Sequence, residues 1–310
     1  AHLLDRAGVV RLCFAGSVLH TRPAGPLSTR EPLQVGAELF GHAGPEADLE
    51  VVEMLLQSLR AAGVPRVRID LAHVGIVRAL VAALPGALED EVFPLLQSKD
   101  APGLSRLLAS APDTPARRAL QALPGLFGPA DAVLAKARAA LPPEPAIVDA
   151  LAQLERLAAA PQPAGGSGLE GDIAFDLGDA RGYPYHSGAI FAAYVDGVPN
   201  AIGRGGRYDN VGAAFGRSRP ATGFSLELRE LAALTPERPP APAVRAPWAD
   251  DPGLAEAVRA LRARGEIVVQ VLPGHEHVQQ EFECDRQLAK QGVGPRTAAR
   301  RPLTWARTSS

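Results

Sequence analysis

The stretch that decides the fold reads Arg204-Gly205-Gly206-Arg207-Tyr208-Asp209, and a second stretch follows at Arg219-Pro220-Ala221-Thr222-Gly223-Phe224-Ser225-Leu226. The first block is neither a Rossmann nor a P-loop signature, because both the glycine spacing and the Lys-Ser/Thr ending are missing. Taken alone, it predicts a tight turn between two strands, with Arg207 and Asp209 as a local ion pair. The rest of the chain gives it another meaning.

Composition points to an ordinary globular protein. The chain has 310 residues, 46% of them hydrophobic and 21% charged, which is enough for roughly two domains. Its net charge of -2 disfavours nucleic acid, whose phosphates need a clustered basic surface. No apolar run approaches the roughly 18 residues of a membrane span. We therefore expect a cytoplasmic protein that binds neither nucleic acid nor membrane.

The two cysteines, Cys13 and Cys284, are too few for a disulfide framework. Cys13 sits among apolar residues in a predicted strand, so we expect a buried, inert thiol. His275, Glu276 and His277 could bind a metal, but they lack any standard ligand spacing. We expect an exposed polar loop there and no metal site.

Strand and helix patterns are segregated along the chain. A strand hairpin is predicted for residues 11–19 and 33–40. Apolar residues recur at helical spacing over 46–62, and polar and apolar residues alternate over 66–71 as in a half-buried strand. Strand patterns return at 173–177, 189–195 and 200–203. Because regular βαβ alternation is missing, we expect an α+β fold with an antiparallel sheet flanked by helices.

An Ala- and Leu-rich region interrupts the strand patterns and predicts short helices at 75–83, 86–97, 102–110, 114–123, 129–140 and 147–159. We divide the chain into a core of residues 1–74 and 166–235, a helical insertion over 75–165, a linker at 236–250, a small C-terminal α/β element over 251–291, and a tail over 292–310 that is expected to be disordered.

Two further stretches accompany the glycine pair. One is Arg181-Gly182-Tyr183-Pro184-Tyr185-His186-Ser187-Gly188, and the other begins at Gly16-Ser17-Val18-Leu19-His20-Thr21-Arg22-Pro23 and continues through Arg30, Gln34, Gly36, Glu38 and Gly41. In order and spacing, the three stretches resemble signatures of the histidyl-tRNA synthetases, which are class II aminoacyl-tRNA synthetases. The resemblance implies a synthetase-like core.

The resemblance also implies a pocket for histidine. Residues matching Gln34 and Glu38 help to hold the ligand in that family, and their i, i+4 spacing puts both on one face of a strand. Arg181 matches an arginine on the carboxylate side of the substrate. The implied ligand-binding residues are Gln34, Glu38, Arg181, Tyr185, Gly205, Gly206 and Tyr208. Without the resemblance, Gln34 and Glu38 would read as the solvent face of a half-buried strand.

The ATP half of the resemblance is eroded. His20 stands where the synthetases have an arginine for the α-phosphate, and Arg22 where they have a glutamate. Glu227, Arg229 and Glu230 stand where they have Gly, Glu and Arg. A glutamate in place of a cation repels the triphosphate that adenylation must stabilise. The chain is therefore expected to have no catalytic residues and no cofactor.

One family combines this core with eroded ATP motifs and no full anticodon-binding domain: the regulatory subunits of ATP phosphoribosyltransferase, which this chain resembles. The resemblance implies a subunit needed both for the activity of a short-form catalytic subunit and for feedback inhibition by histidine, with dimeric self-association. Two alternatives remain: an active histidine-adenylating or tRNA-ligase-like enzyme, and a tRNA-binding paralogue.

Overall fold

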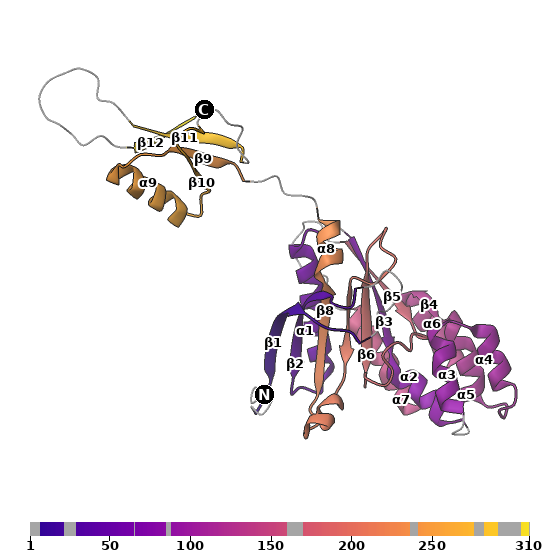
Figure 1. Ribbon diagram of the computed structural model, residues 1–310. Helices are drawn as coiled ribbons and strands as arrows, with labels where there is room; N and C mark the ends of the chain where they lie inside the picture. Colours follow the sequence, from indigo (N-terminus) through magenta and orange to yellow (C-terminus); the bar gives the residue numbers. More distant parts are fainter. Residues whose placement is uncertain are drawn as a thin grey trace, which may run out of the picture. The chain divides into compact units, whose positions relative to one another are not determined.

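The computed structural model describes residues 7–21, 29–64, 66–84, 88–159, 170–235, 241–275, 282–290 and 305–309. The chain divides into two compact units, Ala1–Pro236 and Glu237–Ser310. Each unit contains its own sheet (Figure 1). Among the helices of the described residues, none is long and apolar enough to cross a membrane.

The first unit is built on an eight-stranded sheet of order β1-β2-β8-β7-β6-β3-β5-β4. Every neighbouring pair is antiparallel except β3 and β5, which are parallel, so the sheet is mixed. The strands are β1 (Val10–Ser17), β2 (Leu33–Phe40), β3 (Arg66–His73), β4 (Phe127–Pro129), β5 (Glu170–Asp176), β6 (Ala189–Tyr194), β7 (Gly203–Arg207) and β8 (Ala221–Glu227). The predicted α+β class is confirmed.

Two long helices pack on one face of this sheet. Helix α1 (Pro45–Ala61) contacts β2, β7 and β8, and α7 (Pro145–Ala158) contacts β3 and β6. Both have proline in the first turn, where its missing N–H costs nothing. Leu55 and Leu59 of α1 and Leu154 of α7 are fully buried against the strands. The core of the unit therefore lies between these helices and the sheet.

The insertion forms short helices beside the end of the sheet made by β3, β5 and β4 (Figure 1). Asp100 and Thr114 cap two of them by accepting hydrogen bonds from the main-chain N–H groups of Gly103 and Arg117. The helices are α2 (Val74–Ala82), α3 (Glu89–Gln97), α4 (Ala101–Leu108), α5 (Pro115–Ala122) and α6 (Ala130–Ala140), with the turn η3 (Leu123–Gly125). Their apolar faces join the main core, so the insertion packs as part of the first unit.

After β7, the 3-10 turn η4 (Val211–Phe215) leads into β8, and α8 (Leu228–Leu234) follows β8 directly. The predicted strand at 200–203 is displaced, because β7 begins only at Gly203. Cys13 is exposed, which contradicts the expectation of a buried thiol. It lies on β1, the edge strand, which pairs with β2 alone in the described sheet.

The second unit has a four-stranded sheet of order β10-β9-β11-β12, with β9 parallel to β10 and β11, and β12 antiparallel to β11. Val244, Leu254 and Val258 form its core. Its elements are β9 (Ala243–Pro247), α9 (Pro252–Ala263), β10 (Val268–Val271), β11 (Cys284–Lys290) and β12 (Trp305–Ser309).

This unit corrects two expectations. Residues 243–247, placed in the linker at 236–250, form the strand β9, and Ala243, Val244 and Ala246 are fully buried there. Residues 305–309, placed in a disordered tail over 292–310, pair with β11. Such pairing satisfies the main-chain polar groups of a sheet edge, a stabilisation that local composition does not reveal. The rest of the tail lies outside the described residues.

Candidate functional site

The glycine pair lies inside a strand. Gly205 and Gly206 belong to β7, which pairs with β6 on one side and β8 on the other. The tight turn predicted from the pair alone is therefore wrong. The accompanying Arg207–Asp209 ion pair is present, with 3.3 Å between Nη1 and Oδ1.

Successive residues of β7 point to opposite faces of the sheet, so the stretch Arg204–Arg207 contributes to both faces. We call the face packed against α1 and α7 the buried face and the opposite face the cavity face. Arg207 points to the buried face, where it is 5% exposed and its Nε donates to Oδ2 of Asp48 on α1 at 3.0 Å. It also donates to the carbonyl oxygens of His42 and Gly44. One guanidinium therefore ties β7 to the start of α1.

A cavity of about 300 Å³ opens on the other face, at the lower end of the range for small-molecule pockets. It brings together six of the seven residues implied by the resemblance. The lining residues are Phe14, Gln34, Glu38, Tyr185, His186, Arg204, Gly205, Gly206, Tyr208, Gly223, Phe224 and Ser225. The convergence of residues from β1, β2, β7, β8 and the segment before β6 makes this cavity the candidate site.

Glu38 and two tyrosines form one end of the cavity. The hydroxyl of Tyr208 donates to Oε2 of Glu38, and the Tyr185 and Tyr208 rings stack with centroids 5.1 Å apart. Burial raises the pKa of Glu38 above its ordinary value, and the Tyr208 hydrogen bond opposes that shift. Burial and then the Glu38 charge raise the pKa of Tyr208, so its hydroxyl remains a donor. A carboxylate beside aromatic rings suits a flat group with N–H donors.

The floor of the cavity is bare main chain. Gly206 of β7 pairs with Gly223 of β8, and Gly223 pairs with Glu38 of β2. A methyl group at Gly223 would collide with the Glu38 carboxylate, and one at Gly206 would lie 2.6 Å from the carbonyl oxygen of Ala189. Glycine is needed at both positions because main-chain oxygens and the side chains of Glu38 and His186 occupy the space that a methyl group would take.

The segment before β6 forms a wall of the cavity. His186 Nδ1 lies 3.1 Å from the carbonyl oxygen of Gly182, which closes the segment on itself. The Ser187 hydroxyl accepts a hydrogen bond from the N–H of Asp209, and the N–H of Ser187 donates to the carbonyl of Arg207. Burial lowers the pKa of His186, so the ring is neutral at pH 7. These bonds hold Tyr185 and His186 at the cavity, although Tyr185 is 48% exposed.

Arg181 is not among the lining residues. Its Nε and Nη2 donate to the Asp179 carboxylate at 2.9 and 2.6 Å, and its main-chain N–H donates to Oδ1 of the same residue. Burial alone would raise the pKa of Asp179, but these hydrogen bonds lower it below its ordinary value. The guanidinium implied for the ligand carboxylate is therefore engaged within its own segment.

Two carboxylates, Glu227 and Glu230, lie beside the Gln34 and Arg204 end of the cavity without lining it, and we call this the acidic end. Gln34 Nε2 donates to Oε1 of Glu227 on the neighbouring strand at 2.6 Å. Burial and then the Glu227 charge raise the pKa of Glu230, while Arg204 lowers it. Arg204 belongs to the stretch Arg204–Asp209, but the resemblance gives it no role. The two-residue period of a strand could have assigned it to the same face as Gly206.

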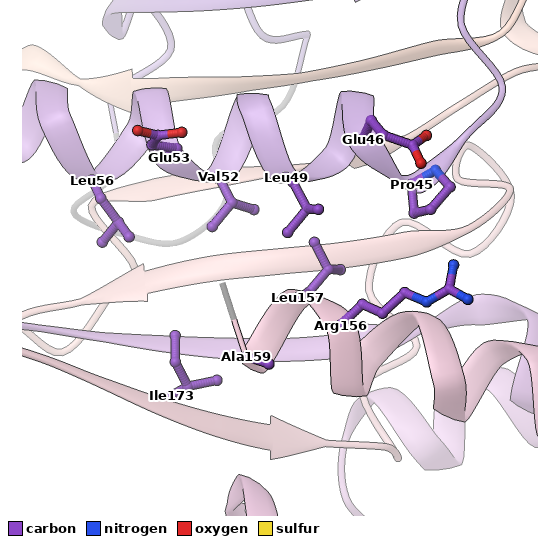
Figure 2. Close-up of a pocket in the computed structure, with 10 residues that line it drawn as sticks. All are labelled: Pro45, Glu46, Leu49, Val52, Glu53, Leu56, Arg156, Leu157, Ala159 and Ile173. Carbon is purple, nitrogen blue, oxygen red and sulfur yellow. The ribbon is translucent and has the colours of Figure 1, made fainter. Parts of the chain in front are cut away.

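A larger cavity, of about 600 Å³, lies between α1, α7 and β5. Figure 2 shows Leu49, Val52 and Leu56 of α1 facing Leu157 of α7 and Ile173 of β5, with charged side chains at its margin. Its lining is mainly aliphatic and lacks convergent polar groups. It therefore has the chemistry of a packing surface, and it ends at Ala159, next to residues outside the described ranges.

Metal binding has no candidate cluster within the described ranges, where no three His, Cys, Asp or Glu side chains converge. His275 is described, whereas Glu276 and His277 lie outside the described residues. The expectation of an exposed loop over this group therefore stays a prediction.

Two family models match the chain. One, described as histidyl-tRNA synthetase, matches residues 1–231. The other, described as the ATP phosphoribosyltransferase subunit HisZ C-terminal domain, matches residues 241–294. A protein from Ralstonia nicotianae described as ATP phosphoribosyltransferase regulatory subunit is 57% identical over 305 residues, which cover 96% of this chain and 77% of that protein.

Solved structures confirm the class II synthetase-like fold. An ATP phosphoribosyltransferase regulatory subunit/histidyl-tRNA synthetase from Bacillus halodurans matches with a TM-score of 0.73 and 27% identity, over 88% of this chain and 71% of that chain. A chain of the ATP phosphoribosyl transferase (HisG:HisZ) complex from Thermotoga maritima matches with a TM-score of 0.56 over 71% of this chain and 74% of that chain. At 18% identity, the second likeness concerns the fold alone.

Proposed function

The chain belongs to the family of ATP phosphoribosyltransferase regulatory subunits, and from this membership we propose that it is the non-catalytic partner of a short-form catalytic subunit in histidine biosynthesis. In this proposal the catalytic subunit carries the phosphoribosyl transfer and needs this chain for activity. Histidine bound to this chain shifts the assembly towards a less active state. The assembly is cytoplasmic, and this chain also associates with itself as a dimer.

The observation that carries the proposal is the contrast between the two ends of the cavity. At one end, Glu38, Tyr185 and Tyr208 offer an anion and stacked rings to an imidazole. The Glu38 carboxylate accepts a hydrogen bond from an imidazole N–H, and the rings of Tyr185 and Tyr208 cover the plane of the imidazole. The glycine floor lets a ligand approach the strands closely. These features support histidine as the small-molecule effector.

The other end supports the absence of adenylation chemistry. Glu227 and Glu230 are close enough for the Glu227 charge to raise the pKa of Glu230. In the synthetases that this chain resembles, the position of Glu230 carries an arginine for ATP. Two carboxylates there repel a triphosphate instead of stabilising its developing charge. A subunit that binds the amino acid without activating it fits this distribution of charge.

The direct test combines the purified chain with a short-form catalytic subunit. We expect phosphoribosyl transfer to require both proteins and to fall as histidine is added. We also expect Glu38→Gln to relieve inhibition without lowering activity in the absence of histidine, because the change removes the imidazole-binding anion and keeps its shape. Equal activity of the catalytic subunit with and without this chain would refute the regulatory role.

The alternative, an active histidine-adenylating enzyme, predicts histidine-dependent exchange of pyrophosphate into ATP by this chain alone. We expect no exchange above a no-enzyme control. A histidyl-tRNA synthetase in the same assay provides the positive control. Clear histidine-dependent exchange would favour the enzyme and overturn the non-catalytic assignment.

A further inference from the structure

We propose that Arg204, and not Arg181, binds the α-carboxylate of the amino acid in this cavity. The inference rests on the proposed function, namely that the cavity is an effector site for histidine. It departs from the role that the synthetase resemblance implies for Arg181, and it assigns a ligand contact to a residue that the resemblance leaves without one.

The strand register gives Arg204 the right position. Arg204 lies on β7 two residues before Gly206, and it pairs with Ser225 while Gly206 pairs with Gly223. Gly223 pairs in turn with Glu38. Two residues along a strand correspond to about 7 Å. The distance along the strands between Glu38 and Arg204 therefore matches the distance between the imidazole ring and the α-carboxylate of one histidine molecule. In this arrangement the ring lies at Glu38 and the α-carboxylate lies at Arg204.

Arg204 is also available to a ligand. It is exposed, it lines the cavity, and its side chain makes no hydrogen bond or ion pair with any other residue that the structure describes. Its charge lowers the pKa of Glu230, against the larger effects of burial and Glu227. Arg181, by contrast, would have to leave the bidentate contact with Asp179 before it could reach a ligand. Charge-assisted hydrogen bonds of this kind are among the strongest that a protein makes.

The surrounding groups fit the other charge of an amino acid. An ionised carboxylate only accepts hydrogen bonds, so Glu227 requires the NH₂ group of Gln34 to face it. The amide oxygen of Gln34 is then directed elsewhere and can accept from an ammonium. Glu227 lies against this amide, and Glu230 lies near both Glu227 and Arg204, although neither carboxylate lines the cavity. One arginine and these acidic groups together complement a zwitterion.

The test compares histidine with histamine, which lacks the carboxylate, by calorimetric titration of the full chain. We expect Arg204→Met to weaken histidine binding about 10- to 100-fold, the usual worth of a charged hydrogen bond. Histamine binding should change less than about twofold, because histamine has no carboxylate to contact Arg204. Arg204→Lys, which keeps the charge, should recover part of the loss.

Two variants serve as controls. Arg181→Met should leave the ratio of histidine to histamine affinity at the wild-type value. Arg229→Met removes an exposed cation from α8 that does not line the cavity, and it should also leave the ratio unchanged. Circular dichroism checks that each variant is folded.

The outcomes separate this inference from the proposed function. If the wild-type chain binds histidine but Arg204→Met binds it equally well, or if Arg181→Met selectively loses histidine, the Arg204 assignment is wrong and the effector site stands. If the wild-type chain binds no histidine, both the effector site and the Arg204 assignment are overturned.

Discussion

On one face of the eight-stranded sheet, alternate residues meet α1 and α7 in an apolar core. On the other face, their neighbours line a cavity in which polar side chains mix with aromatic rings and glycines. The block at 204–209 contributes to both, since Arg207 joins β7 to α1 while Arg204 and Gly206 face the cavity. Changes on the buried face should therefore alter stability first, and changes on the cavity face should alter ligand affinity first. Variants on each face test that separation, the largest expected effect first.

Breaking the buried ion pair should have the largest effect. Replacing Arg207 by Met leaves Asp48, which is 1% exposed, as an unpaired charge. We expect a loss of about 3–5 kcal/mol in the free energy of unfolding, measured by urea titration. The matched control is Arg118→Met, which breaks the exposed pair with Asp113 and should cost less than about 1 kcal/mol. Equal shifts in the two variants would contradict the central place given to Arg207.

Filling the floor of the cavity should mainly affect binding. The methyl group of Gly223→Ala would meet the Glu38 carboxylate, so we expect histidine affinity to fall about 100-fold, with a stability loss of about 1–3 kcal/mol. Gly16→Ala is the control, because a methyl group at this β1 glycine meets no heavy atom within 4 Å. Retained affinity in a folded Gly223→Ala chain would show that the ligand does not use this floor.

The buried face should also carry a pH dependence. His73 accepts a hydrogen bond from the N–H of Gly75 and contacts Gln153, and burial lowers its pKa to about 4. Since the unfolded pKa is about 6.5, the unfolded state binds the proton more readily between these values, and stability falls as pH drops through that window.

We expect the wild-type chain to lose about 2 kcal/mol more than His73→Asn between pH 7 and pH 5, measured by urea unfolding at each pH. Asparagine keeps a polar cap for α2 but does not titrate there. A constant difference between the two proteins at both pH values would show that His73 does not contribute this dependence. Histidine affinity, measured for both proteins at pH 7 and pH 5, provides a second measurement. The change in affinity with pH should not follow the change in stability.

The smallest effect should come from the acidic end of the cavity. Glu227→Gln lets either end of the new amide face Gln34, so the Gln34 amide loses its fixed direction. We expect histidine affinity to fall about fivefold, or about 1 kcal/mol, in a calorimetric titration. Glu53→Gln on α1 is a control that should leave affinity unchanged. An equal loss from Glu53→Gln would mean that net charge, not the hydrogen bond, governs binding.

Much of the cavity could be predicted because its residues obey local rules. The spacing of Gln34 and Glu38 puts them on one face of a strand whatever the rest of the fold does. The resemblance to the synthetase signatures predicted that Tyr185, Tyr208 and the glycine pair belong to the same pocket. What could not be predicted was the partner of Arg181, since a nearby acidic residue and a ligand compete for one guanidinium and only the folded geometry decides between them.

The errors in the fold have a similar cause. Strand β9 was assigned to a linker because prolines surround it, yet the parallel neighbours β10 and β11 bury it. Strand β12 depends on β11, which is separated from it by residues outside the described ranges. Cys13 was expected to be buried because its neighbours are apolar, but an edge strand has only one partner to cover it. Each error concerns a contact between segments that are distant in the sequence.

The bare floor of the cavity limits what its sequence signature can reveal about ancestry and use. A methyl group at Gly205 would collide with the Phe191 ring and the carbonyl of Gly223, so packing of the sheet requires this glycine whether or not a ligand binds. Related proteins that no longer bind the ligand would still need glycine at this position. Packing alone therefore accounts for Gly205, and a change of ligand during divergence would be recorded in the walls, at positions such as Glu38, Tyr185 and Arg204.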